Sequence, residues 1–130
     1  MEVYSKSIEV KANHLDEVNH VNNVVFLQWV QDISKEHWLS KTDDLINSKM
    51  FWVVRSHHID YKKQVFLGDQ LKVKTFVNSC RGPFSERVVE FWRAKDQVAR
   101  AKSNWCLLGT GDQKPLRVPD EIQSLFLLED

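Results

Sequence analysis

The sequence predicts an α+β fold in which a curved antiparallel β-sheet wraps around one long central α-helix. Three observations support this architecture: one segment has helical periodicity, later segments alternate between apolar and polar residues, and turn signals separate those segments. A helix with apolar residues on most of its sides needs a sheet to cover it. The 130 residues suffice for one domain, which we expect to span residues 1–130.

The first third of the chain contains one expected strand and the helix. Residues 4–10 alternate in the manner of a β-strand, and the polar segment 13–22 is rich in turn-forming residues. The helix is expected over residues 23–39. Three of its apolar residues recur on one face: Val25, Trp29 and Ile33. Because Val24 and Leu27 are also apolar, we expect the early turns of this helix to be buried on most sides.

Four strands are expected after the helix, beyond a polar stretch at residues 40–49. They correspond to four alternating segments: 51–65, 71–77, 87–94 and 98–108. Tight turns are expected at Gly68-Asp69, at Gly82-Pro83 and at Asp96-Gln97. Strands that are joined by such short turns pair antiparallel. A short apolar turn at residues 122–128 follows the last strand.

Composition and charge argue against several classes of protein. The chain carries 18 basic and 18 acidic side chains, and this zero net charge disfavours nucleic-acid binding through bulk electrostatics. Cys80 and Cys106 form no CxxC pair, and no cluster of His, Asp and Glu has ligand spacing, so we expect no metal. The N-terminal residues lack the features of a signal peptide, and no apolar run is long enough for a membrane span. We therefore expect a cytoplasmic protein with neither a membrane nor a nucleic-acid partner.

The segment from Asp16 to Asn23 is the most informative part of the sequence. It places an acid, an imidazole and amide side chains just before the expected helix. A helix N-terminus offers free backbone N–H groups and the positive end of the helix dipole. A carboxylate beside such a pole can attack a carbonyl, while the N–H groups hold the oxyanion that forms. An Asp in a turn also commonly binds the loop backbone, which is the alternative role for Asp16.

The chain resembles the hotdog-fold acyl thioesterases over nearly its whole length. The resemblance is carried by His20-Val21-Asn22-Asn23, with Asp16 four positions before the histidine and with Phe26 and Trp29 after the motif. The 4-hydroxybenzoyl-CoA thioesterase-like branch and the plant acyl-carrier-protein thioesterases share a similar motif. Two further segments give weaker support: Tyr61 with Gly68-Asp69, and residues 114–119. The resemblance implies a hotdog fold, acyl thioester hydrolysis and a ligand groove between two subunits.

By this resemblance, Asp16 matches the acid that attacks the thioester carbonyl or activates water against it. Asn23 matches the position whose backbone N–H polarises that carbonyl, and His20 matches a histidine of the plant branch. The chain departs from the plant pattern at Val18, where that branch has Asn, and at Gln64-Val65, where it has Glu-Cys. The second departure removes a catalytic carboxylate, which favours a mechanism that depends on one acid, Asp16.

The remaining candidate residues have less specific expected roles. His20 either orients Asp16 or the attacking water, or it braces the loop. Asn22 is expected to cap the helix rather than to act in the chemistry. Tyr61 and Gln64 are candidate substrate-binding residues, although an exposed strand end is the favoured interpretation of Gln64. Five basic residues are expected to be solvated, with some available for the phosphates of coenzyme A: Lys62, Lys63, Arg87, Arg93 and Lys95.

We therefore expect an acyl thioester hydrolase, in the first place an acyl-CoA thioesterase, that uses no cofactor. An acyl-carrier-protein thioester is the other expected substrate class, and a homodimer or homotetramer is the expected assembly. Two alternatives remain open at the level of the sequence: a hotdog dehydratase or hydratase, and a non-catalytic acyl-binding hotdog protein.

Overall fold

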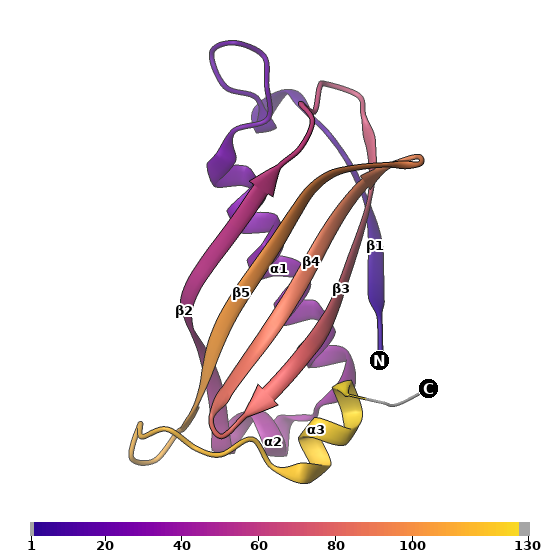
Figure 1. Cartoon of the computed structure of the whole chain (residues 1–130). Coiled ribbons are helices and arrows are strands. Elements are labelled where there is room, and N and C mark those ends of the chain that lie inside the picture. The colour runs from indigo at the N-terminus through magenta and orange to yellow at the C-terminus, as the bar shows by residue number, and fades with distance from the viewer. Residues whose placement is uncertain (1, 128–130) are drawn as a thin grey trace.

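One five-stranded antiparallel sheet forms the body of the fold, and the long helix α1 (Asn23–Lys41) lies across one face of it (Figure 1). This computed structural model describes residues 2–127. The strands are β1 (Tyr4–Glu9), β2 (Met50–Tyr61), β3 (Gln70–Arg81), β4 (Phe84–Arg93) and β5 (Asp96–Gly109). Their spatial order is β1-β3-β4-β5-β2, so β1 and β2 form the two edges. Every neighbouring pair is antiparallel, and the predicted α+β hotdog fold is confirmed.

Three shorter helical elements accompany the sheet: a 3-10 turn (Ala12–His14), α2 (Asp44–Lys49) and α3 (Asp120–Phe126). α2 lies in the stretch of residues 40–49, for which the sequence predicted only a polar character and no helix. Asp43 begins α2 by accepting a hydrogen bond from the backbone N–H of Ile46 at 2.9 Å. α3 takes up most of the predicted apolar turn, of which Leu128 lies outside the described residues. Within residues 2–127, no helix combines the length and the apolar character that crossing a bilayer requires.

Several strand boundaries differ from the predicted ones. β3 continues to Arg81 rather than ending at residue 77, and β4 begins at Phe84 rather than at residue 87. β2 ends at Tyr61 rather than at residue 65, because the backbone N–H groups of Lys62 and Lys63 both turn to the carbonyl of Val98. The turn between β4 and β5 falls at Ala94-Lys95 rather than at residues 96–97, and Ala94 takes a left-handed backbone with a φ of 54°. The strand order and the pairing are unaffected by these differences.

β2 contains a bulge at Arg55, where its register against β5 shifts. Residues that pair directly across two strands lie on the same face of a sheet. Val54 faces the side of α1 before the bulge, and His57 and Tyr61 face that side after it. The Tyr61 ring consequently packs edge-on against Phe26 of α1, with the ring centroids 5.4 Å apart.

The main core lies between α1 and the sheet. Phe26, Trp29 and Ile33 of α1 are buried there against residues of the central strands. The ring of Phe91 on β4 is completely buried and meets Phe26 edge-on, with the ring centroids 5.2 Å apart. Val24, by contrast, is 68% exposed. The expectation that the early turns of α1 are buried on most sides was wrong, because the sheet covers one side of this helix.

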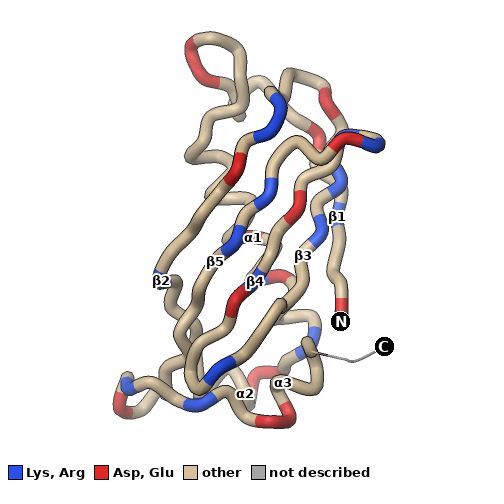
Figure 2. Tube along the Cα trace, viewed as in Figure 1, with Lys and Arg blue, Asp and Glu red and all other residues tan. Residues whose placement is uncertain are grey.

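Charged residues of both signs are distributed along the strands (Figure 2). On the face of the sheet that lies away from α1, the side chains of Glu90 and Arg100 approach to 3.8 Å. The Lys74 ammonium lies 5.7 Å from the centre of the Trp92 ring on the neighbouring strand. Such exposed contacts contribute at most about 1 kcal/mol each. The mixed signs keep this face hydrophilic without one dominant charge.

Candidate active site

Two loops meet at the end of the molecule where α1 begins (Figure 1). Residues 10–22 lead into α1, and residues 62–69 connect β2 to β3. The backbone N–H of Val21 donates to the carbonyl of Val65 at 3.3 Å. The N–H of Gly68 donates to the carbonyl of Val10 at 2.9 Å. These bonds hold the segment that contains Asp16 beside the end of β2.

The side chain of Asp16 closes its own loop. Its Oδ1 atom accepts hydrogen bonds from the backbone N–H groups of Val18 at 2.9 Å and His20 at 3.1 Å. The N–H of Asp16 donates to the carbonyl of His20 at 2.8 Å, and Asn19 between them has a left-handed φ of 63°. The side chain is exposed, and Oδ2 accepts no hydrogen bond from the described residues. The arrangement fixes the carboxylate through one oxygen and leaves the other oxygen available.

The first turn of α1 is capped by Asn22, as predicted. Its Oδ1 atom accepts from the N–H of Val24 at 2.9 Å, and its carbonyl accepts from the N–H of Val25 at 2.9 Å. The N–H of Asn23 donates to no group in residues 2–127. Because the first N–H groups of a helix have no partner inside it, the Asn23 N–H can receive an outside acceptor.

His20 contacts the neighbouring loop rather than Asp16. Its ring lies edge-on to Phe66, with the centroids 5.8 Å apart, and Phe66 is itself 46% exposed. Within the described residues, the imidazole nitrogens of His20 form no hydrogen bond with the Asp16 carboxylate. His20 contacts this carboxylate through its backbone N–H. The structure thus brings His20 and Asp16 together through the main chain of one loop.

Tyr61 and Gln64 lie at the end of β2 and just beyond it. Burial raises the pKa of the Tyr61 phenol, so this group stays neutral at physiological pH. The Gln64 side chain is exposed. The backbone carbonyl of Gln64 accepts a hydrogen bond from Arg93 Nη1 at 2.9 Å. The same Nη1 contacts Asp69 at 2.7 Å, so the main chain of Gln64 and the turn at Asp69 share one support.

Within residues 2–127, no group of three His, Cys, Asp or Glu side chains is arranged to hold a metal ion. His57 and His58 illustrate the reason, since successive strand residues point to opposite faces. His57 is half-buried and burial lowers its pKa, while His58 is exposed and contacts Asp60 at 3.2 Å. Each histidine therefore has its own surroundings.

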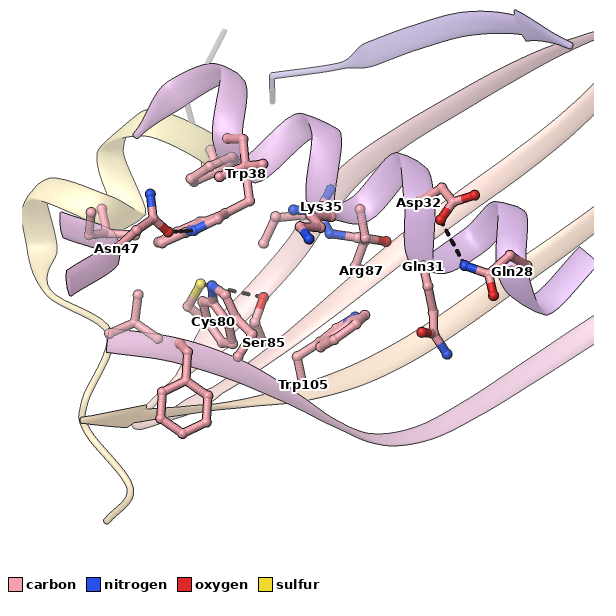
Figure 3. Close-up of a pocket in the computed structure, with 18 residues that line it drawn as sticks. Gln28, Gln31, Asp32, Lys35, Trp38, Asn47, Cys80, Ser85, Arg87 and Trp105 are labelled. Atoms are coloured by element: carbon pink, nitrogen blue, oxygen red, sulfur yellow. Dashed lines mark hydrogen bonds between the residues drawn. The ribbon is translucent and has the colours of Figure 1, made fainter. Parts of the chain in front are cut away.

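A second feature lies apart from Asp16, and the sequence interpretation missed it. A cavity of about 510 Å³ opens between α1 and β2, and its lining includes no residue from 16 to 23 (Figure 3). Arg87 of β4 lines it and is only 6% exposed, so the expectation that Arg87 is solvated was wrong. The alternation of β4 contained the signal, because Arg87 shares its face with Val89 and Phe91, both of which are buried.

Comparison with known proteins identifies relatives. The sequence matches the family model for the acyl-ACP thioesterase N-terminal domain over residues 1–126. Two solved structures with this fold cover the chain well. YbaW, a probable thioesterase from Escherichia coli, has 21% identity and a TM-score of 0.83, covering 93% of this chain and 94% of that chain. Slr0204 from Synechocystis, a 1,4-dihydroxy-2-naphthoyl-CoA thioesterase, has 18% identity and a TM-score of 0.81, covering 95% of each chain.

A third similar structure contains coenzyme A. It is SAV2348 from Staphylococcus aureus in complex with CoA, with 12% identity and a TM-score of 0.86, covering 95% of this chain and 81% of that chain. At these identities the three likenesses establish the fold. No curated protein matches the sequence significantly.

Proposed function

Because the chain belongs to the acyl-ACP thioesterase family, we propose that it hydrolyses acyl thioesters and that acyl-CoA is its substrate. One observation carries the proposal: the Asp16 carboxylate is fixed through Oδ1 in the loop that leads directly into α1. The N–H of Asn23 lies at the positive end of the helix dipole and has no acceptor within residues 2–127. An acid and an oxyanion donor are the two groups that hydrolysis of a thioester requires.

In the proposed reaction, the thioester carbonyl oxygen accepts a hydrogen bond from the Asn23 N–H. Asp16 Oδ2 attacks the carbonyl carbon, and the tetrahedral intermediate places its negative charge on the oxygen that this N–H holds. Collapse of the intermediate breaks the C–S bond and releases the thiolate, which leaves a mixed anhydride. Water then hydrolyses the anhydride and restores the carboxylate. In the water-mediated variant, Asp16 takes a proton from water, the hydroxide adds to the carbonyl, and the thiolate leaves with that proton.

The other residues near the loop have supporting roles in this proposal. Asn22 caps the helix start, where the Asn23 N–H lies. His20 braces the loop through its contact with Phe66. Tyr61 offers a neutral phenol, and Gln64 a side-chain amide, to the bound substrate. Support for CoA as the thiol comes from the relative of similar fold that is described in complex with CoA.

Thiol release from a panel of thioesters tests this function directly. The panel contains short, medium, long and aromatic acyl-CoA substrates, with matched acyl-carrier-protein thioesters in parallel. We expect release of free thiol well above the uncatalysed rate from at least one acyl-CoA. If hydrolysis occurs only with the carrier-protein thioesters, the choice of CoA is wrong. If the protein binds acyl-CoA and releases no thiol from any thioester, it is an acyl-binding protein and the catalytic proposal fails.

The edge strand β2 supports a homodimer. An unpaired edge exposes backbone N–H and C=O groups that can pair with another chain. β2 occupies one edge, and three of its exposed residues are apolar: Phe51, Val53 and Val54. We propose that two copies meet along β2, and that the second copy completes the substrate site beside Asp16.

Light scattering checks this assembly. Phe51→Asp combined with Val53→Asp places charge on the edge, and we expect the dimer to dissociate into monomers at micromolar concentration. The matched control is Ser5→Asp combined with Ser7→Asp on β1, the other edge, which should leave the dimer intact. A wild-type monomer at micromolar concentration with full hydrolytic activity would contradict the proposal.

A further inference from the structure

The cavity between α1 and the sheet has walls of a distinctive kind. Large aromatic side chains contribute to the lining: Trp38, Phe51, Trp52, Trp105 and Phe126. Its volume of about 510 Å³ lies in the range of small-molecule sites, which is roughly 300–1,000 Å³. Figure 3 shows Arg87 and Trp105 near the middle of the cavity, Trp38 toward one end and Gln28 toward the other. The space is elongated along α1, and its middle contains polar groups.

Arg87 places a nearly buried positive charge in this wall. Its Nη1 donates to Nδ1 of His37 at 2.8 Å and to Oγ1 of Thr75 at 3.1 Å. Arginine has five N–H donors, and the Nε and Nη2 donors of Arg87 have no acceptor within residues 2–127. No carboxylate of the described chain lies within 4 Å of this guanidinium. Burial lowers the pKa of Arg87 to about 10, so the group is still a cation at neutral pH.

Among the described residues, the groups behind Arg87 include no carboxylate in direct contact with it, and the Phe126 ring centre lies 6.0 Å from the guanidinium carbon. His37 is completely buried, and burial lowers its pKa, so its neutral form is the relevant one near pH 7. In that form Nδ1 accepts from Arg87, and Nε2 donates to the carboxylate of Glu2. Glu2 also contacts Lys41 at 3.4 Å, which takes up part of its negative charge. A buried charge without a direct partner is costly, so an anion on the cavity side would stabilise this arrangement.

Trp105 provides a second, independent indication of a ligand. Within residues 2–127 its Nε1–H has no hydrogen-bond partner, and this atom is closed to solvent although the indole lines the cavity. The ring of His57 lies edge-on to this indole, with the ring centroids 6.2 Å apart, and the Nε2 atom of His57 also lacks a partner in the described part of the chain. Buried polar groups are nearly always hydrogen-bonded, and an unsatisfied one calls for an acceptor. Ser85, which is buried and lines the cavity close to Cys80, adds a hydroxyl.

We propose that this cavity binds an apolar carboxylate, whose chain or ring lies against the aromatic walls while its carboxylate accepts hydrogen bonds from the free donors of Arg87. Rotation of the Trp105 indole, whose Nε1–H is closed to solvent in this structure, exposes a further donor to the ligand. The site stands apart from the proposed reaction, because no residue from 16 to 23 lines it. The carboxylate has two sources in this proposal: a free fatty or aromatic acid, or the far end of an acyl group whose thioester lies elsewhere.

Calorimetric titration of the full chain with dodecanoate, dodecanol and 2-naphthoate tests the site without any hydrolysis. We expect dodecanoate or 2-naphthoate to bind, and dodecanol to bind at least about tenfold more weakly than dodecanoate, because it cannot form the charge-assisted bond. In Arg87→Met, dodecanoate should lose about that factor while dodecanol binds as before. Arg100→Met, which removes an exposed cation on the opposite face, is the matched control and should bind like the wild type.

Two further variants keep the test decisive if Arg87→Met fails to fold, which circular dichroism would reveal. Arg87→Lys keeps the charge and should keep a preference for dodecanoate over dodecanol. Trp105→Phe keeps the ring and should weaken dodecanoate binding by a smaller factor. The site is refuted if neither acid binds, if dodecanol binds as tightly as dodecanoate, or if the folded Arg87 variants bind dodecanoate unchanged.

A pair of thioesters separates the two sources of the carboxylate. Faster hydrolysis of ω-carboxydodecanoyl-CoA than of dodecanoyl-CoA, with the preference lost in an Arg87 variant, assigns the site to the far end of the substrate. Arg87-dependent binding of dodecanoate without that preference assigns it to free acids. Binding that depends on Arg87 in a protein that hydrolyses no thioester supports the site and refutes the proposed function. Hydrolysis of a thioester by a protein that shows no Arg87-dependent binding supports the proposed function and refutes the carboxylate site.

Discussion

Asp16→Asn is expected to lower kcat for acyl-CoA hydrolysis by at least roughly a hundredfold, because it removes the proposed nucleophile or base. The amide keeps the shape of the side chain, and its oxygen still accepts from the N–H groups of Val18 and His20. The loop should therefore stay closed and the melting temperature nearly unchanged. Steady-state hydrolysis of the best acyl-CoA from the panel, with a thermal melt of the same preparation, measures both quantities.

Two comparison variants sharpen this test. Glu17→Gln removes the neighbouring exposed acid and should leave kcat unchanged, which separates the role of Asp16 from a general loss of negative charge. His20→Ala removes the contact with Phe66, and it should lower the melting temperature and raise KM more than it lowers kcat. A large loss of kcat in His20→Ala, with one limb of the pH–rate profile removed, would give His20 a part in the chemistry. Near wild-type turnover in Asp16→Asn would refute the catalytic assignment.

Phe91→Ala is expected to destabilise the protein by about 3–5 kcal/mol, through the lost burial of the ring and the cavity that it leaves. The Phe91 ring is completely buried. It meets Phe26 edge-on and lies 6.2 Å from Trp29, so one truncation removes contacts to two aromatic residues of α1. Urea denaturation followed by tryptophan fluorescence measures the free energy of unfolding.

Phe84→Ala is the matched control for this truncation. Phe84 is partly exposed, and the guanidinium of Arg55 lies 4.6 Å from its ring centre. The loss here should be no more than about 1 kcal/mol, the size of an exposed cation–π contact. Equal losses in the two variants, or a loss below about 1 kcal/mol in Phe91→Ala, would show that the face of α1 toward β4 is not the main source of stability.

The sequence predicted the architecture because its main signals are local. The spacing of Val25, Trp29 and Ile33 indicated the helix, and the alternation after residue 50 indicated the strands. The exposure of α1 could not be predicted in the same way, since it depends on how far the sheet extends over the helix. Val24 is apolar and yet exposed, and periodicity contains no information on what covers a given side.

For the candidate site, the motif predicted the cap at Asn22, and the structure has it. The contact between His20 and Phe66 could not be predicted, because it joins two loops that are distant in the sequence. Arg87 was assigned to solvent from its residue type alone. The alternation of inward and outward residues along β4 places Arg87 on the buried face with Val89 and Phe91. On this strand, alternation predicted the burial of Arg87 better than its residue type did.

The bulge at Arg55 determines which residues of β2 face α1 at the two ends of the strand. Trp52 reaches the cavity from the first half of β2, and Tyr61 reaches the Asp16 end from the second half. Nine positions separate them, an odd number, so a strand of unbroken alternation would put them on opposite faces. Insertion or deletion of one residue between Trp52 and Tyr61 would turn one of these two side chains to the face away from α1. Insertion or deletion of two residues would keep both side chains on the α1 face. The number of β2 residues between the Asp16 end and the cavity can therefore change only in even steps, as long as a single bulge is kept.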